Sequence, residues 1–397
     1  MKKILFIHHG SAWGGAPNSL IRLIKSLDYS DYEAKVLLLK PSIVADKLNE
    51  NGIRFDIASS VFYTKYYQYF THSEADYLKW YQVFPIIRLG LFWLLSRYYF
   101  ARKELARHEY DLVHLNSSVL TDWLAPAKEK GKVIIHIREP FRNGKCDLLK
   151  RIFKYQIFKY ADRIIAISKD NATRINMPDK TSVVYNYSEI ENFQELNIEK
   201  YSSKSVLYVG GSESIKGFYT LVDALKYIHD DIRVYFSGYF SKILADEDGG
   251  VNAKVKKLLK SIRHRRETLS YFKIEKSLNA EKVGLLTDIN DYIDKSVCLV
   301  SPFSIPHFSR PIIEAFGRRK PAIATSIEGM DELVEDGLDG ILVEKDNAKA
   351  LADAINYLCL NPQIAKRMGD YGFKVAQEKF SQNNINQICS IYRNLLD

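Results

Sequence analysis

The feature that most constrains the fold of this chain is a unit of strand, glycine loop and helix that occurs twice. The first copy begins at residue 2, where the apolar run KKILFIH leads into the loop HGSAWGG and then into PNSLIRLIKSL. The second copy begins at residue 205 with SVLYVGG, followed by SESIKG and FYTLVDALKYI. Such a unit opens a doubly wound α/β domain. The repeat therefore predicts two α/β domains in series.

Apolar residues in the two helical segments recur at helical spacing, and short apolar runs predict the remaining strands. One helical face carries Leu20, Leu23, Ile24 and Leu27, and the corresponding face of the second helix carries Phe218, Leu221, Leu225 and Ile228. The strand candidates are AKVLLL, DLVHL, KVIIHI and DRIIAI in the first half, and IRVYFSG, SVCLVSP, PAIAT and GILV in the second. Continuous apolar strands of this kind are typical of a parallel sheet that is covered on both faces.

The length of the chain supports this division. At 397 residues it exceeds one ordinary hydrophobic core. We predict a Rossmann-like N-terminal domain over 1–186, a second Rossmann-like domain over 187–375, and a helix over 376–397 that packs back on the first domain. Doubly wound sheets bind ligands beyond the carboxyl ends of their strands. We therefore expect the two domains to face each other across a cleft that binds the ligand.

Composition narrows the partners and the compartment. The net charge of +9 favours an anionic partner, which could be nucleic acid, phospholipid headgroups or a phosphorylated small molecule. The basic run KVKKLLKSIRHRR has no accompanying pattern of stacking aromatics, so we expect no nucleic-acid partner. The four cysteines lack paired or metal-like spacing and indicate free thiols in a reducing compartment. The first apolar run is too short for a signal peptide, and we expect a cytoplasmic protein.

A cation and a carboxylate stand one turn apart at the start of a predicted helix in PHFSRPIIEAFG, residues 306–317. Ser309 is suited to the N-cap of this helix and Pro311 to its first turn. An isolated pair with the spacing of Arg310 and Glu314 is ordinarily a surface ion pair. A cation at a helix N-terminus, however, opposes the helix dipole. A ligand with a diphosphate beside Arg310 and a ribose diol on Glu314 would explain both residues.

The two glycine loops are candidates for contacting the phosphates. Neither matches the dinucleotide fingerprint G-x-G-x-x-G or a P-loop. Gly14 and Gly15 in the first loop, and Gly211 and Ser212 in the second, precede a helix N-terminus, where backbone N–H groups attract phosphate. Alternatively, glycine serves only the dihedral angles of a tight turn. Lys216 follows the second loop and adds a mobile positive charge, which favours phosphate binding.

The chain resembles the GT-B glycosyltransferases of family 4, a family of retaining enzymes, in the type that builds bacterial surface polysaccharides. The resemblance is carried by RPIIEAFGRRKPAIATSIEGMDELVEDGLDGILV, and by GG at 14–15, DLVHLNS, ADRIIAIS, VVYN and YVGG…KG in this order along the chain. It implies that Glu314 holds the ribose. We assign nucleotide-sugar binding to a wider set, namely Gly14, Gly15, Gly211, Ser212, Lys216, Leu286, Phe308, Ser309, Arg310 and Glu314. Acceptor binding is assigned to Asn116 and Glu139.

Three positions depart from the family pattern. The first Glu of the family's Glu-x7-Glu falls on Pro306, the Arg that follows the family's Val-Gly is replaced by Gly211, and the N-domain His falls on Arg138. We infer that Arg310 supplies the phosphate charge that Gly211 lacks, and that His307 contacts the sugar. His136 and Arg138 alternate on a strand and point to the same side, so we expect both to flank the sugar donor as catalytic groups with His307. Alternatively, His136 is an ordinary buried histidine.

The resemblance implies transfer of a sugar, with retention, from a nucleotide diphosphate sugar to a hydroxyl of a glycan or lipid-linked acceptor in cell-surface polysaccharide biosynthesis. It also implies a hexosyltransferase-like enzyme without metal or cofactor, in which the leaving phosphate accepts the acceptor's proton. We accordingly expect no metal at Asp246–Asp248. Two alternatives share the fold: a nucleotide-sugar epimerase, and a catalytically silent protein that binds a glycan or a partner subunit.

Two aromatic and basic segments suggest contact with a membrane. The segments are PIIRLGLFWLLSRYYF, residues 85–100, and LLKRIFKYQIFKY, residues 148–160. The first is too short and too charged to span a bilayer, yet too apolar for a solvated loop. Aromatic rings mixed with cations suit the headgroup region of an anionic bilayer, so we expect peripheral contact with the inner face of the cell membrane. Alternatively, these helices pack on the N-terminal sheet or line an acceptor groove.

Overall fold

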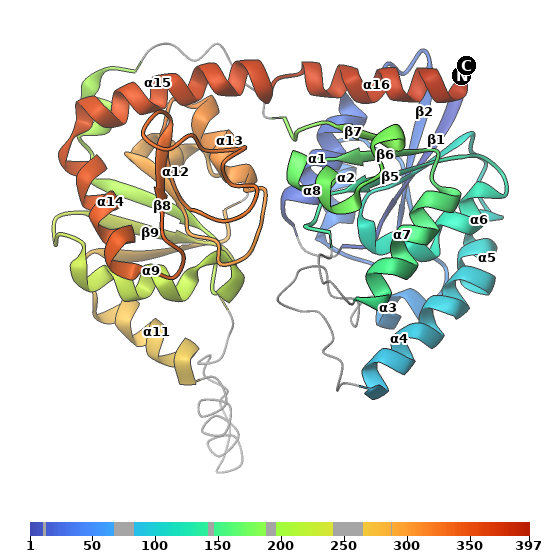
Figure 1. Ribbon diagram of the computed structural model, residues 1–397, viewed down its shortest axis with the longest axis horizontal. Helices are drawn as coiled ribbons and strands as arrows, with labels where there is room; N and C mark the ends of the chain where they lie inside the picture. Colours follow the sequence, from blue (N-terminus) through green and yellow to red (C-terminus); the bar gives the residue numbers. More distant parts are fainter. Residues whose placement is uncertain (11–12, 67–82, 142–146, 188–195, 241–264, 287) are drawn as a thin grey trace. The chain divides into compact units, whose positions relative to one another are not determined.

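The computed structural model describes residues 1–397 except 11–12, 67–82, 142–146, 188–195, 241–264 and 287. The chain divides into two compact units (Figure 1). Unit 1 comprises Met1–Tyr187 with Gln382–Asp397, and unit 2 comprises Ser188–Ser381. Each unit contains one parallel sheet with crossover helices, which confirms the prediction of two doubly wound α/β domains. The predicted terminal segment 376–397 is divided between the two units, because its first residues continue a helix of unit 2.

Seven parallel strands form the sheet of unit 1, in the order β3–β2–β1–β4–β5–β6–β7. Their bounds are β1 Lys2–His8, β2 Tyr32–Leu38, β3 Phe55–Ile57, β4 Leu112–Leu115, β5 Lys132–Ile137, β6 Arg163–Ala166 and β7 Thr181–Val183. In the register of β1, Phe6 lies opposite Val36 of β2 and His114 of β4. The strands predicted from apolar runs are all present. The two outermost strands, β3 and β7, were not predicted.

Two helical layers cover this sheet. On one face, an apolar cluster joins Leu5, Ile7 and Val113 of the sheet to helices of the middle of the chain. These are α3 Phe62–Tyr66, α4 Val83–Leu95, the π-helical turn η2 Ser96–Phe100, α5 Ala101–Leu105, η3 Ser118–Asp122, α6 Leu124–Lys128, α7 Leu148–Tyr160 and α8 Lys169–Ile175. On the other face, Ile4 and Phe6 belong to a cluster with α1 Gly15–Lys25, α2 Ile43–Glu50 and α16 Asn383–Leu396.

Six parallel strands form the sheet of unit 2, in the order β10–β9–β8–β11–β12–β13. Their bounds are β8 Ser205–Val209, β9 Arg233–Ser237, β10 Ala280–Gly284, β11 Cys298–Ser301, β12 Ala322–Thr325 and β13 Gly340–Val343. β10, at one edge, was not predicted. The helices are η5 Ile198–Tyr201, η6 Ser214–Lys216, α9 Phe218–Ala224, η7 Leu225–Tyr227, α11 Arg265–Lys276, α12 Asn290–Lys295, α13 Arg310–Gly317, α14 Ala348–Leu360 and α15 Pro362–Lys379.

Burial agrees with the predicted helical faces. All four residues predicted for the face of α1 are buried, and so are the four predicted for α9 and its extension. Of the four cysteines, Cys298, Cys359 and Cys389 are buried free thiols, as predicted, and Cys146 lies outside the described residues. In the described part of the chain, no helix has both the length and the apolar character needed to cross a bilayer.

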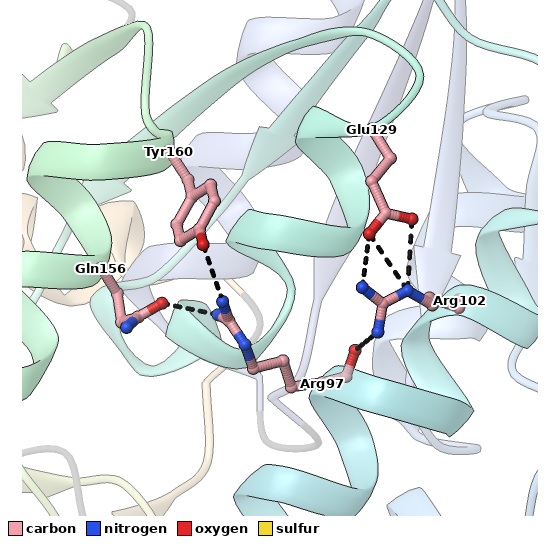
Figure 2. A network of polar contacts seen from close by, with 5 residues as sticks. All are labelled: Arg97, Arg102, Glu129, Gln156 and Tyr160. Atoms are coloured by element: carbon pink, nitrogen blue, oxygen red, sulfur yellow. Dashed lines mark hydrogen bonds and ion pairs between the residues drawn. The ribbon is translucent and has the colours of Figure 1, made fainter.

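A buried arginine connects two helices of unit 1 that are far apart in sequence (Figure 2). Arg97 of η2 is only 7% exposed and donates to Gln156 Oε1 at 2.5 Å and to Tyr160 OH at 3.1 Å, both on α7. Arg102, five residues later, donates to the backbone oxygen of Arg97 and pairs with Glu129 at the surface. The two arginines share one helical segment but differ in burial, so they form a matched pair for mutation.

We expect Arg97→Ala to lower the free energy of unfolding by about 2–4 kcal/mol. The substitution removes the buried guanidinium group with its two hydrogen bonds, and leaves Gln156 and Tyr160 without their donor. Arg102→Ala should lower it by only about 0.2–1 kcal/mol, since its carboxylate partner is half exposed and water screens the pair. Urea denaturation of the two variants measures both changes. Equal losses of stability in the two variants would contradict a stabilising role for the hydrogen bonds that connect η2 to α7 through Arg97.

Candidate functional site

Most of the predicted site residues lie where the winding of each sheet reverses. In unit 1, β1 and β4 are neighbours, and in unit 2, β8 and β11 are neighbours. In doubly wound sheets the loops at such a point separate and leave a crevice at the carboxyl edge of the strands. The segments that follow these four strands are 9–14, of which 11–12 lie outside the described residues, 116–117, 210–217 and 302–309. They contain eight of the fifteen predicted positions, namely Gly14, Asn116, Gly211, Ser212, Lys216, His307, Phe308 and Ser309, and two more, Gly15 and Arg310, begin the helices that follow.

In unit 2, the loops after β8 and β11 pack directly on each other at Gly217. This glycine has φ of 76°, and a Cβ atom there would lie 1.8 Å from the backbone oxygen of Pro302. Nearby, the N–H of Ser304 donates to the backbone oxygen of Ile215 at 2.9 Å. The contact therefore excludes any side chain at position 217. It also brings Lys216 and His307, which are far apart in sequence, into the same small region.

The backbone of the second glycine loop is already hydrogen bonded. The N–H of Gly211 donates to the backbone oxygen of Ser237 at 2.9 Å, and the N–H of Ser212 to that of Tyr239 at 3.0 Å. Contrary to expectation, these two N–H groups are therefore not available to a phosphate. Gly211 has φ of 58°, and a Cβ atom would lie 2.1 Å from the oxygen of Tyr239. The arginine of the family pattern would not fit this backbone.

His307 is a neutral ring beside a cation. Its imidazole stacks on Phe303 with the ring centroids 4.2 Å apart. Burial, together with the neighbouring charge of Lys216, lowers the pKa of His307 to about 4. Lys216 itself is about one-third exposed and pairs with Glu213 at 3.1 Å. At physiological pH, His307 can therefore exchange hydrogen bonds with a ligand but carries no charge, whereas Lys216 is an accessible cation.

The helix α13 begins as predicted, but its first residues make different contacts. Ser309 occupies the N-cap position, yet its hydroxyl is hydrogen bonded to the hydroxyl of Ser301 at 2.8 Å and does not cap the helix. Phe308 is buried, and its ring contacts Phe380. Neither side chain extends freely into solvent. Phe308 and Ser309 therefore pack inside the loop, and the polar groups that a ligand can reach belong to neighbouring residues.

Arg310 and Glu314 form a largely buried pair. Arg310 Nη2 lies 2.5 Å from Glu314 Oε1, and the side chains are only 7% and 15% exposed. The surface ion pair that the spacing alone would suggest is therefore wrong. We expected Arg310 to face a diphosphate, but its guanidinium group is directed at Glu314 instead. The described residues give the second oxygen of Glu314 no hydrogen bond, so this oxygen can accept one from a ligand.

In unit 1, Arg138 is the centre of a polar chain across the carboxyl ends of three neighbouring strands. It is buried, and its Nε donates to Asn116 Oδ1 at 2.5 Å while its Nη1 donates to Asn186 Oδ1 at 3.1 Å. Asn116 Nδ2 lies 3.2 Å from His8 Nδ1 at the end of β1. Sequence reasoning missed His8 and Asn186. Asn186 ends the VVYN motif, which could have identified it.

His136 has a different place from the one expected. It is 2% exposed, and its Nδ1 lies 3.2 Å from Nε2 of His114, whose Nδ1 lies 2.7 Å from the hydroxyl of Tyr392 on α16. Burial lowers the pKa of both histidines well below the usual value, and the charge of Arg138 lowers it further. His136 is thus a neutral group in the core of unit 1. The assignment of His136 as a catalytic group is corrected to this structural role, the alternative that the sequence left open.

The remaining predicted residues have plainer surroundings. Glu139 accepts hydrogen bonds from Ser117 Oγ at 2.9 Å and from the N–H and hydroxyl of Ser118, so its carboxylate holds the loop after β4. Gly14 is the N-cap of α1 in extended backbone, and a Cβ atom there would meet nothing within 4 Å. Leu286 is half-buried just after β10. Of these three, Gly14 is the one beside open space.

Within the described ranges, no three or more His, Cys, Asp and Glu side chains come together in a group that could hold a metal ion. Asp246–Asp248 and most of the basic run that follows lie outside the described residues.

Two family models match the chain, one for each unit. The model described as Glycosyltransferase Family 4 matches residues 13–187, and the model described as Glycosyl transferases group 1 matches residues 189–375. Both families therefore extend across the residues of the candidate sites, including Arg138 in the first segment and Glu314 in the second.

Known proteins similar to the chain include named glycosyltransferases. It is 25% identical over 315 residues to an uncharacterized glycosyltransferase of Methanocaldococcus jannaschii, which covers 78% of this chain and 82% of that protein. It is 26% identical over 190 residues to the capsular polysaccharide biosynthesis glycosyltransferase CapM of Staphylococcus aureus, 48% of this chain and 46% of that protein. Anabaena HepE in complex with UDP-glucose has the same fold, with a TM-score of 0.71, 21% identity, and coverage of 99% and 100% of the two chains.

The loop contact at Gly217 can be tested against another glycine with the same backbone. Gly337 has φ of 79° but a Cβ atom there would meet nothing within 4 Å. We expect Gly337→Ala to lower the free energy of unfolding by about 1–2 kcal/mol, from backbone strain alone. Gly217→Ala should cost about 3 kcal/mol or more, because the new methyl also collides with Pro302. If chemical denaturation finds equal costs, the loops are not in contact there.

Proposed function

We propose, from the premise that this chain belongs to the family 4 glycosyltransferases with the GT-B fold, that it transfers a sugar from a nucleoside diphosphate sugar to a hydroxyl of a glycan or lipid-linked acceptor. The observation that carries this proposal is Glu314. It is a largely buried carboxylate with one oxygen held by Arg310 and the other open, one turn inside a helix that starts at the winding reversal of unit 2. A ribose diol supplies the two hydroxyl donors that such an oxygen accepts.

The neighbours of Glu314 suit the rest of a sugar donor. Lys216 is an accessible cation of this region. It would balance the charge of the diphosphate, which would lie one turn closer to the loops than the ribose. His307, uncharged at neutral pH and next to Lys216, would exchange hydrogen bonds with the sugar. Arg310 is a positioning residue in this arrangement, since it orients the carboxylate of Glu314. The bound UDP-glucose of the Anabaena neighbour supports a nucleotide sugar as ligand.

The titration of these groups supports a mechanism without a protein base. His307, with a pKa of about 4, is a poor proton acceptor, and His136 is enclosed in the core of unit 1. The leaving diphosphate would then accept the proton of the attacking hydroxyl as the bond between sugar and phosphate breaks. Transfer with retention, a hexosyl group and independence from metal ions are parts of this proposal.

The acceptor belongs to unit 1 in this proposal. The chain of Arg138, Asn116 and His8 reaches the carboxyl edge of its sheet and offers a cation with hydrogen-bonding partners, which suits a glycan or a lipid phosphate. We place the reaction in the synthesis of a cell-surface polysaccharide, at the cytoplasmic face of the cell membrane. The similarity to CapM, a capsular polysaccharide enzyme by name, supports this pathway.

Three substitutions separate the contacts to the ribose from those to the diphosphate. Glu314→Ala should weaken a nucleoside and its diphosphate equally, by about tenfold or more, because a hydrogen bond to a charged group contributes about 1.5–3 kcal/mol. Arg310→Ala should do the same, since Glu314 then loses its orientation. Lys216→Ala should weaken the diphosphate alone. Calorimetry of the unmodified protein with the nucleoside diphosphates of the different bases first identifies the base that binds. The affinities of the three variants for that nucleoside and for its diphosphate are then measured in the same way.

The outcomes of this test are distinct. Glu314→Ala with affinities within twofold of the unmodified protein would rule out the ribose contact. If Arg310→Ala weakens binding of the diphosphate but not of the nucleoside, Arg310 contacts the phosphates and does not act by positioning Glu314. Glu213→Ala, which releases Lys216 from its partner, serves as a control and should leave nucleoside binding unchanged.

The reaction itself is tested with a panel of nucleotide sugars and mass spectrometry. One of them should release its nucleoside diphosphate slowly without acceptor, and this activity should persist in EDTA. Interconversion of two nucleotide sugars would identify an epimerase, and no turnover of any would identify a silent binding protein. Complete loss in EDTA that Mn²⁺ restores would contradict the metal-independent mechanism.

A further inference from the structure

We propose that unit 1 docks on an anionic lipid bilayer through the outer surface of α4, η2 and α7. This inference deepens the proposed function and rests on it for the membrane-bound acceptor. The docking face consists of Phe84, Ile87, Leu91, Leu94 and Tyr98 on α4 and η2, and of Leu148, Ile152, Tyr155 and Phe158 on α7. No described helix can cross a bilayer, so the contact is one of helices that lie on the surface.

The first half of the docking face is an exposed apolar stripe. Phe84 is 85% exposed and Ile87 62%, and Leu91, Leu94 and Tyr98 are each about half exposed. These residues are spaced three or four positions apart and therefore share one side of the helix. The opposite side of the helix packs on the apolar core of unit 1, since Leu89 is buried there and Phe92 contacts it. A stripe of large apolar side chains in water indicates a surface that another phase or molecule covers.

The second half of the docking face lies in the same helical layer. Leu148, Ile152, Tyr155 and Phe158 of α7 are exposed at helical spacing, while Phe153 and Ile157 are buried in the same core cluster that receives α4. Arg97 fixes the two helices to each other through Gln156 and Tyr160 (Figure 2). Both exposed stripes therefore belong to one helical layer of unit 1, because their buried sides share one cluster and one hydrogen-bonded connection.

Charge identifies the occupant. Residues 83–100 and 148–160 contain no Asp or Glu, although the whole chain has 48. Arginine and lysine stand between the apolar residues, and the exposed cations Arg88, Arg151 and Lys159 are among them. Exposed tyrosines accompany them, as in proteins that rest at the headgroup level. A bilayer with anionic lipid meets both the apolar and the cationic groups. A second copy of the chain would instead bring like charges together across a symmetric interface.

Sedimentation with lipid vesicles tests the docking face. The full chain should bind vesicles of equal parts phosphatidylcholine and phosphatidylglycerol at low salt, be released as salt rises, and bind pure phosphatidylcholine weakly. Phe84→Ser/Ile87→Ser/Leu91→Ser and Arg151→Glu/Lys159→Glu should each weaken binding to the anionic vesicles at least tenfold. The matched controls are Leu278→Ser/Leu360→Ser and Lys226→Glu/Lys345→Glu, which change exposed residues of unit 2 and should leave binding unchanged.

Three other results of the binding experiments overturn the proposal. Undiminished sedimentation of the apolar or the charge variant places the contact elsewhere, and equal binding to both vesicle types removes the electrostatic part. A dimer that the apolar variant converts to a monomer assigns the face to a second copy. Acceptor-free release of nucleoside diphosphate is measured on the same samples. Vesicle binding without this activity would support the docking face and contradict the proposed function. Activity without vesicle binding would support the proposed function and contradict the docking face. Thermal unfolding midpoints show whether each variant is folded.

Discussion

Parallel strands can be joined only by crossovers, and this constraint links the fold of each unit to its site. A parallel sheet is covered on both faces only when the chain winds first in one direction along the sheet and then in the other. The reversal leaves β1 beside β4 and β8 beside β11, with loops that leave on opposite faces. Asn116 and Lys216 reach their places through this winding. The requirement to cover two faces thus creates the position at which a polar ligand can bind.

The same constraint explains which strands could be predicted from the sequence. Central strands are buried on both faces and consist mostly of apolar residues, so KKILFIH, KVIIHI and SVLYV are evident as strands. The missed strands β3, β7 and β10 all lie at the edge of a sheet, where burial is partial. Residues such as those of TSV or AEKVG produce no apolar pattern there. Their place is decided by hydrogen bonds to a neighbouring strand, which no local window contains.

The site divides in a similar way. Motif and spacing identified the loops, because glycines, a proline and the start of an amphipathic helix are local signals. They did not determine what each side chain contacts. Whether Arg310 and Glu314 form a surface or a buried pair depends on the packing of α13 within unit 2, and the spacing is the same in both cases. The position of His136 depends on Tyr392, which is far away in sequence. The sequence therefore predicted in which loops these residues lie better than it predicted what each side chain contacts.

The last helix has a consequence for how the protein is made. Ile385, Ile388 and Tyr392 of α16 belong to the same apolar cluster as Phe6 and Tyr32, and Tyr392 is hydrogen bonded to His114 across 278 positions of sequence. All of unit 2 is synthesised between these partners. On the ribosome, the first sheet must therefore wait, with one face incompletely covered, until the second unit has emerged. The order of translation thus makes unit 2 the first of the two that can complete its core.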